Sequence, residues 1–175
     1  MKLVLALLLT ASAAAATCPP VAPAGDRTAK LLTDLLKAPS EGAANQAAGG
    51  LWEIWLTAPD AEAQRLLDRA IDARRVDLAG SEKLLDDLTV YCPDYPEGFN
   101  QRAFTRFLRQ DFEGALEDID TVLERVPHHF GALSGKALTL FALGRDDDAQ
   151  DVLRRAVRVH PFLRERSLIK EPERL

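Results

Sequence analysis

Residues Phe99–Pro127 read FNQRAFTRFLRQDFEGALEDIDTVLERVP, and residues Leu133–Pro161 read LSGKALTLFALGRDDDAQDVLRRAVRVHP. The prolines that close the two stretches are 34 residues apart, and Pro93 and Pro59 continue that spacing toward the amino terminus. Proline ends helices because it lacks a backbone N–H and clashes with the preceding turn. Helix terminators on one fixed period predict a row of similar helical hairpins.

Small and aliphatic residues recur on the same period in the second helix of each unit. Columns three or four residues apart share one helix face, and a small residue flanked by aliphatic ones suits close helix packing. We therefore predict an all-α solenoid of stacked antiparallel helical hairpins. The three columns are Ala47, Ser81, Ala115 and Ala149; Leu51, Leu85, Ile119 and Leu153; and Ile54, Leu88, Val122 and Ala156.

The two quoted stretches resemble the tetratricopeptide repeat (TPR), a helix–turn–helix unit of 34 residues. The strings EGFNQRA and HHFGALSG are also similar to small secreted TPR proteins of alphaproteobacteria. An arginine directly before the first-helix alanine implies a pair with an acid on the second helix, here Arg102 with Asp118. The residues that carry the resemblance, with structural roles, are Ala103, Ala137, Gly144, Ala115, Ala149, Val122, Ala156, Pro127 and Pro161.

The repeat divides the chain into seven predicted segments. Pro39 cuts short the first helix of the first unit, which we interpret as a degenerate repeat or an amino-terminal cap. The segments are a signal peptide (1–16), a proline-rich arm (17–25), that cap (26–61), a divergent TPR (62–95), two TPRs (96–129 and 130–163) and a C-terminal capping helix (162–170). The helices expected before the capping helix span about 26–38, 43–58, 60–75, 80–91, 96–109, 112–125, 129–143 and 146–159.

The amino-terminal segment has the pattern of a secretory signal. Lys2 precedes the short apolar run Leu3–Leu9, and Ala14 and Ala16 supply small residues for cleavage after Ala16. The run is too short to span a membrane, and no other segment is long and apolar enough to do so. We expect a periplasmic or secreted protein without a membrane span.

Composition and motifs argue against several classes of function. The net charge of −5 disfavours nucleic-acid binding, which needs clustered Lys and Arg. The sequence has no nucleophile–base–acid pattern, glycine-rich phosphate loop or metal-ligand cluster. We therefore expect a non-catalytic protein with no cofactor and no metal.

Both cysteines, Cys18 and Cys92, follow the predicted cleavage site. An even number of cysteines in an exported chain favours one disulfide. The alternatives are two free thiols, or cleavage directly before Cys18 with attachment of a lipid. Thr17 departs from the small residue that lipoprotein signals favour at that position.

Resemblance to TPR proteins implies that the first helices of the hairpins line a concave groove. The expected binding residues are Glu97, Asn100, Gln101, Phe104, His129 and Ser134. Phe107, Leu108, Leu138 and Phe141 share that face. Gly131 and Gly135, one helical turn apart, suggest close approach by a helix or a ligand, because glycine destabilises helices. Trp52 and Trp55 are expected to pack the cap onto the first repeat.

These features predict a scaffold or adaptor that holds a peptide or protein partner in the groove. One alternative is a structural protein whose groove is filled by a second copy or by the arm at 17–25. The other is a lipid-anchored envelope-assembly factor carrying an acylated Cys18.

Overall fold

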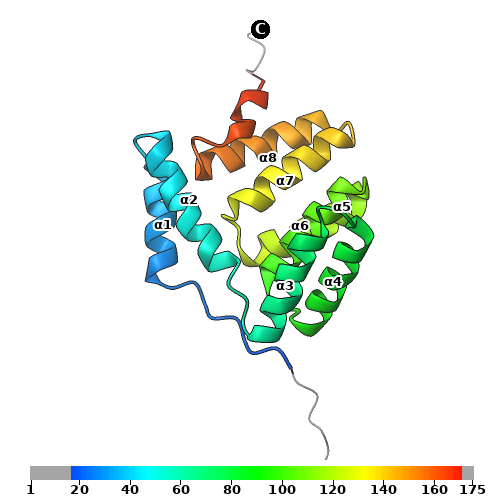
Figure 1. Cartoon of the computed structure of the whole chain (residues 1–175). Coiled ribbons are helices and arrows are strands. Elements are labelled where there is room, and N and C mark those ends of the chain that lie inside the picture. Colours follow the sequence, from blue (N-terminus) through cyan, green and yellow to red (C-terminus); the bar gives the residue numbers. More distant parts are fainter. Residues whose placement is uncertain (1–16, 171–175) are drawn as a thin grey trace, which may run out of the picture.

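The computed structural model describes residues 17–170, so the predicted signal peptide lies outside the described residues. The regular secondary structure of these residues is helical, and consecutive helices pack in pairs as the hairpins α1–α2, α3–α4, α5–α6 and α7–α8 (Figure 1). The prediction of an all-α solenoid is confirmed. The α-helices are α1 (Asp26–Leu36), α2 (Glu41–Trp55), α3 (Ala61–Ala73), α4 (Leu78–Tyr91), α5 (Pro96–Leu108), α6 (Phe112–Arg125), α7 (Phe130–Ala142) and α8 (Asp146–Val159), followed by the 3₁₀ helix η1 (Arg164–Leu168).

Local signals explain where the helices begin and turn. The side chains of Asp77 and Asp111, 34 residues apart, accept hydrogen bonds from backbone N–H groups at the starts of α4 and α6. Gln110 and Gly144 occupy equivalent turns with φ values of 65° and 72°. Glycine adopts this left-handed conformation without strain, whereas glutamine does so at a cost.

Three hairpins, α3–α4, α5–α6 and α7–α8, stack in chain order, with α4 against α5 and α6 against α7. The small column lies inside them, because Ser81, Ala115 and Ala149 are completely buried. Ser81 also donates a hydrogen bond to the Ala70 carbonyl across its hairpin, at 2.8 Å. The repeat unit read from the sequence is therefore the packing unit of this part of the molecule.

The first hairpin does not continue the stack. Residues of α1 and α2 share one apolar core with α7, α8 and Leu163, while α3 and α4 form a separate core. Figure 1 shows α1 and α2 on the other side of the molecule from α4, with the α5–α6 and α7–α8 hairpins completing the arrangement between them. We had expected the Trp52 and Trp55 side chains to pack the cap onto the first repeat. They pack instead on His129 and Phe130, at the start of the last repeat.

The path of the chain after α2 helps to explain why the first hairpin packs on the last repeat. The helix expected to reach residue 58 ends at Trp55, and Leu56–Asp60 leads to α3. In the other units the second helix ends two residues before its proline, whereas α2 ends four residues before Pro59. The connection after Trp55 has five residues, against four between α4 and α5 and between α6 and α7, so the first hairpin joins the stack with a different spacing.

Both ends of the described chain are held by contacts. Cys18 and Cys92 form a disulfide with a Cα–Cα distance of 5.1 Å, which attaches the arm to the end of α4. The expected capping helix is only a 3₁₀ helix of five residues. The Gln150 side chain binds the Leu168 carbonyl and the Lys170 N–H, backbone groups that a longer helix would use itself.

Candidate functional site

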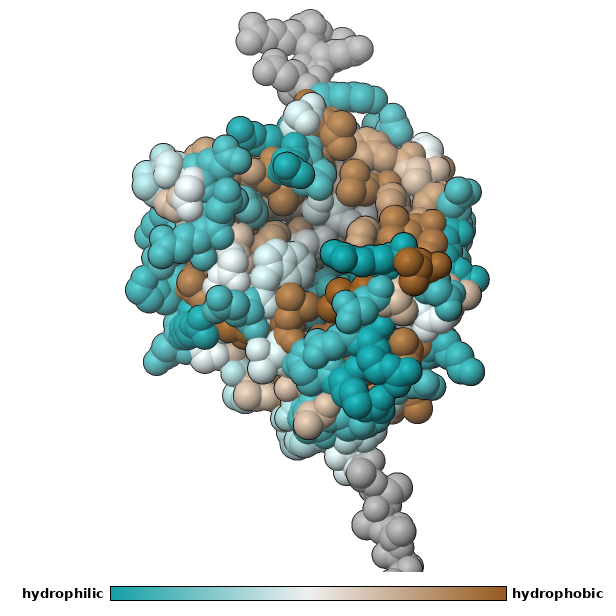
Figure 2. All heavy atoms as spheres, in the orientation of Figure 1, coloured by the Kyte–Doolittle hydropathy of each residue, from teal (hydrophilic) through white to brown (hydrophobic). Residues whose placement is uncertain are grey.

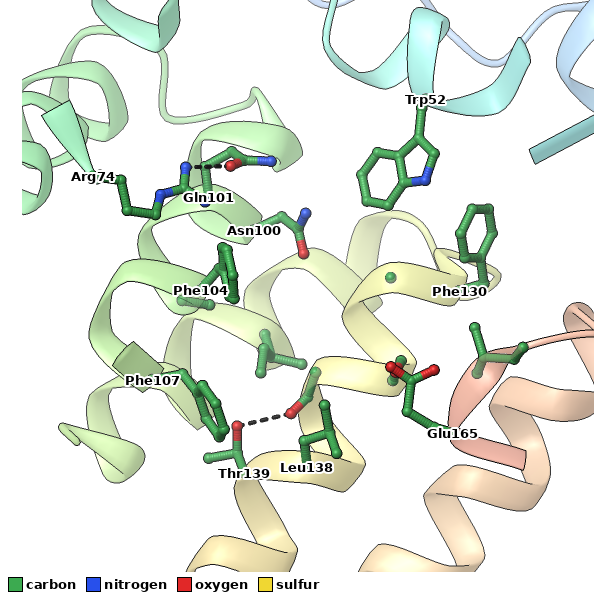
Figure 3. A pocket seen from close by; sticks show the side chains of 16 residues that line it. Trp52, Arg74, Asn100, Gln101, Phe104, Phe107, Phe130, Leu138, Thr139 and Glu165 are labelled. Carbon is green, nitrogen blue, oxygen red and sulfur yellow. Dashed lines mark hydrogen bonds between the residues drawn. The ribbon is translucent and has the colours of Figure 1, made fainter. Parts of the chain in front are cut away.

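The concave face holds a pocket of about 410 Å³ between α5 and α7. Figure 3 shows Phe104 and Phe107 projecting into it from α5, opposite Leu138 and Thr139 of α7. In Figure 2, apolar residues gather near the middle of the visible face, within a border of hydrophilic ones. The remaining lining residues are Trp52, Arg74, Asn100, Gln101, Ala103, Ile119, Phe130, Gly131, Ser134, Gly135, Leu163 and Glu165.

Four of the six predicted binding residues line this pocket: Asn100, Gln101, Phe104 and Ser134. Phe104 is half exposed, so its ring forms an open wall rather than a buried core contact. The two amides are less available than we expected, because both donate hydrogen bonds to the Glu97 carboxylate. The groove can therefore offer an apolar surface with few free polar groups.

Glu97 and His129 do not line the pocket, contrary to our prediction. Each is only 1 % exposed, and His129 Nε2 lies 3.0 Å from the Glu97 carboxylate. His129 Nδ1 accepts the Ala132 N–H, so the ring hydrogen is on Nε2 and points at Glu97. The Trp55 ring stacks on the imidazole with centroids 3.8 Å apart. These two residues join α5, α7 and α2 behind the pocket instead of contacting a ligand.

Trp52 closes one end of the pocket. An added Cβ on Gly131 would lie 2.6 Å from the Trp52 ring, whereas one on Gly135 would meet nothing closer than 3.7 Å. The close approach that we inferred from the two glycines is thus made at Gly131 by the chain's own first hairpin. No residue of the arm at 17–25 lines the pocket.

A cation and an anion also line the pocket. The Arg74 guanidinium lies 4.8 Å from the Phe104 ring centroid and donates a hydrogen bond to Gln101 Oε1, as Figure 3 shows. Burial lowers the pKa of Arg74, and the nearby Glu97 charge partly offsets that effect. Arg74 Nε is buried without a hydrogen-bond partner within the described residues. Glu165 contributes its carboxylate from η1.

Sequence reasoning missed Trp52, Arg74 and Glu165 as lining residues. The repeat could have identified Arg74, because it precedes Leu108, a residue we assigned to the groove, by one period. Leu108 itself does not line the pocket, nor does Phe141. No periodic signal marks Trp52 or Glu165, since both reach the pocket from outside the three stacked hairpins.

Beside the pocket, arginines of α5 hold neighbouring hairpins together. Arg102 donates two hydrogen bonds to Asp118, at 2.9 and 2.7 Å, and further ones to Asp86 and Thr89. Arg106 contacts Asp118 at 2.9 Å as well. The pair that the TPR resemblance implied is present, and it extends to α4. These contacts fix α5 between α4 and α6, and so position the wall that carries Phe104.

The arrangement suits binding more than chemistry. The pocket walls are aromatic and aliphatic, and the charged groups at its edge, Arg74 and Glu165, are not joined in an acid–base pair. Within residues 17–170 no group of three or more His, Cys, Asp or Glu side chains could hold a metal ion. In the same residues no helix is long and apolar enough to cross a membrane.

Comparison with known proteins agrees with the architecture. No family model matches the chain, and no solved structure matches it. A TPR repeat-containing protein of Rhizobium etli is 35 % identical over 94 residues, which cover 54 % of this chain and 45 % of that relative. The chain thus spans less than half the length of the curated relative that it matches. This similarity, together with hairpins that pack in consecutive pairs, confirms that the chain resembles tetratricopeptide-repeat proteins.

Proposed function

We propose that this protein is a non-catalytic scaffold that binds a peptide or protein partner in the pocket between α5 and α7. The observation that carries the proposal is the half-exposed Phe104 ring on the wall of a preformed apolar pocket. Aromatic side chains in such positions anchor partner side chains, and a rigid surface lowers the entropic cost of binding. The TPR resemblance supports a role in protein interaction.

We further propose that the protein acts in the periplasm. The signal-like segment at 1–16 and the disulfide between Cys18 and Cys92 both favour an exported chain. A sulfur in a disulfide has no valence left for a lipid, which favours the scaffold over the lipid-anchored alternative. An intact-mass spectrum of protein from the periplasm tests this: we expect a chain that begins at Thr17 and carries no acyl group.

Site-specific photocrosslinking tests the binding proposal. A benzoylphenylalanine at position 104 replaces one exposed aromatic ring by another and places the reactive group in the pocket. The matched control carries the same residue at position 90, because Val90 is 83 % exposed on α4 and does not line the pocket. We expect a covalent adduct with a partner protein when the crosslinker is at position 104, and no adduct when it is at position 90.

Other outcomes separate the alternatives. An adduct with twice the mass of the chain would favour self-association through the exposed Phe104 and Leu108 side chains. Equal adducts from positions 104 and 90 would show that partners do not prefer the pocket. The absence of any adduct from position 104, when the crosslinker is activated in intact cells, would contradict the proposal.

A further inference from the structure

A second pocket, of about 390 Å³, lies on the seam where the first hairpin meets the last. Leu32 and Leu36 of α1 form one side of it, and Leu133 of α7 and Val159 of α8 form the other. Leu133 is 1 % exposed, whereas Leu36 is 53 % exposed, so the apolar surface runs from the interior to the rim. Its other lining residues are Thr33, Pro127, His128, Arg155 and Arg158. None of them belongs to the concave pocket.

The charged and titratable residues that line this pocket are all basic. Arg155 and Arg158 are three residues apart on α8, so both side chains lie on the same helix face, and both are exposed. Within residues 17–170 neither forms an ion pair, although the adjacent Arg154 pairs with Asp151 at 3.0 Å. No Asp or Glu lines the pocket, in a chain with 27 acidic and 22 basic residues.

The helix dipole accounts for only part of this pattern. Basic residues near a helix C-terminus are stabilised by the carbonyl end, and Arg158 lies in the last turn of α8. The dipole would favour a basic side chain equally on any face of that turn. It does not require two guanidinium groups beside an apolar pocket that forms only where the first hairpin meets the last.

We propose that this second pocket binds an anionic amphiphile of the fatty-acid type. The alkyl chain would lie against Leu32, Leu36 and Leu133, and the carboxylate would accept hydrogen bonds from Arg155 and Arg158. Arginine presents a planar fork that matches a carboxylate, and hydrogen bonds between charged groups are stronger than neutral ones. A pocket of this volume lies within the range of small-molecule sites.

Calorimetric titration of the folded protein with decanoate at low ionic strength tests the proposal. We expect one saturable site, and we expect the R155Q/R158Q variant to weaken its affinity by about tenfold or more, since both charged hydrogen bonds are lost. The matched control is R154Q, which removes a charge of the same sign one residue away and should change the affinity by less than about twofold. Circular dichroism verifies that each variant is folded.

A second variant tests the apolar half of the pocket. Thr33 is exposed on α1 and lines the pocket, so Thr33→Phe fills it without disturbing the core, and we expect binding to be lost. Phe104→Ala, in the other pocket, should leave binding unchanged. Four results would overturn the proposal: no saturable site in the wild type, equal affinity of the wild type and R155Q/R158Q, equal affinity for decyltrimethylammonium, or loss of binding in Phe104→Ala.

Discussion

Two glycines of α7, one helical turn apart, have different surroundings. A Cβ at Gly131 would meet the Trp52 ring at 2.6 Å, and one at Gly135 would make an ordinary contact with Ile119 at 3.7 Å. The same substitution at the two positions therefore separates helix propensity from packing against the first hairpin.

We predict that Gly135→Ala raises the free energy of unfolding by up to about 1 kcal/mol, because alanine favours the helix. Gly131→Ala should lower it by about 1–3 kcal/mol through overpacking against Trp52. In a Trp52→Ala background the Gly131→Ala change should become stabilising, which is a strong non-additivity. Urea unfolding of the four variants measures these differences. Equal effects at the two glycines would contradict the contact between Trp52 and α7.

His160, directly after α8, couples stability to pH. Its ring is buried, lies edge-on to Phe130, and has an unpartnered Nδ1 within the described residues. Burial lowers the pKa of His160 below its ordinary value. The unfolded chain then binds a proton more readily than the folded one, so this contribution to stability is complete above about pH 6.5 and falls as the pH drops below that value.

We expect His160→Leu to reduce the loss of unfolding free energy between pH 7 and pH 5, by at most about 1.4 kcal/mol per pH unit. Urea titrations at the two pH values provide the measurement. An unchanged slope in His160→Leu would show that the ring does not resist protonation.

At the scale of elements, the arm at 17–25 is attached to α4 by a disulfide that links residues 74 positions apart. A crosslink of this span restricts the unfolded chain, with a contribution of about 4 kcal/mol in the chain-entropy model. Cys92 is buried among apolar residues such as Leu85 and Leu88, whereas Cys18 is only partly buried.

Cys18→Ser should therefore destabilise the protein by up to about 4 kcal/mol, the same amount as reduction of the wild type with dithiothreitol. Cys92→Ser should destabilise it further, because a serine hydroxyl would be buried in an apolar cluster. Urea unfolding of the two variants, with and without reductant, measures both effects. Identical stability of wild type and Cys18→Ser would mean that the disulfide does not form in solution.

At the scale of the whole molecule, the first hairpin converts an open row of repeats into a closed arrangement. It contacts the last hairpin through Trp55 and His129, residues separated by 74 positions, and Tyr95 donates a hydrogen bond to the Trp55 carbonyl at 2.6 Å. The first and last repeats are thus coupled directly, whereas in an open solenoid each repeat contacts only its neighbours.

This coupling predicts a single cooperative unfolding transition. Both tryptophans of the chain lie at the contact between the first and last hairpins, so tryptophan fluorescence reports that contact alone. Far-UV circular dichroism reports all helices. We expect the two probes to give coincident urea transitions. A fluorescence transition at lower urea would show that the first hairpin detaches before the stack unfolds.

The sequence made the stacked part of the fold predictable because its contacts repeat. The small and aliphatic columns and the Arg102–Asp118 pair are contacts between helices that are close along the chain, and the periodic prolines mark where those helices end. Each of these features therefore leaves a local pattern in the sequence. The same reasoning located Asn100, Gln101, Phe104 and Ser134 on the pocket wall. The reasoning failed for Glu97 and His129. Successive residues of a helix are rotated by about 100° around its axis, so a buried position can lie directly beside one on the pocket wall.

The sequence by itself determined the helical hairpins, their period and the concave side of the stack. Only the tertiary structure decided where the first hairpin docks, that Trp52 closes the pocket, and that a second pocket with a basic rim forms on the seam. These features join residues far apart in sequence through contacts that occur once. A contact that does not repeat leaves no periodic pattern, and the packing of complementary surfaces alone selects it.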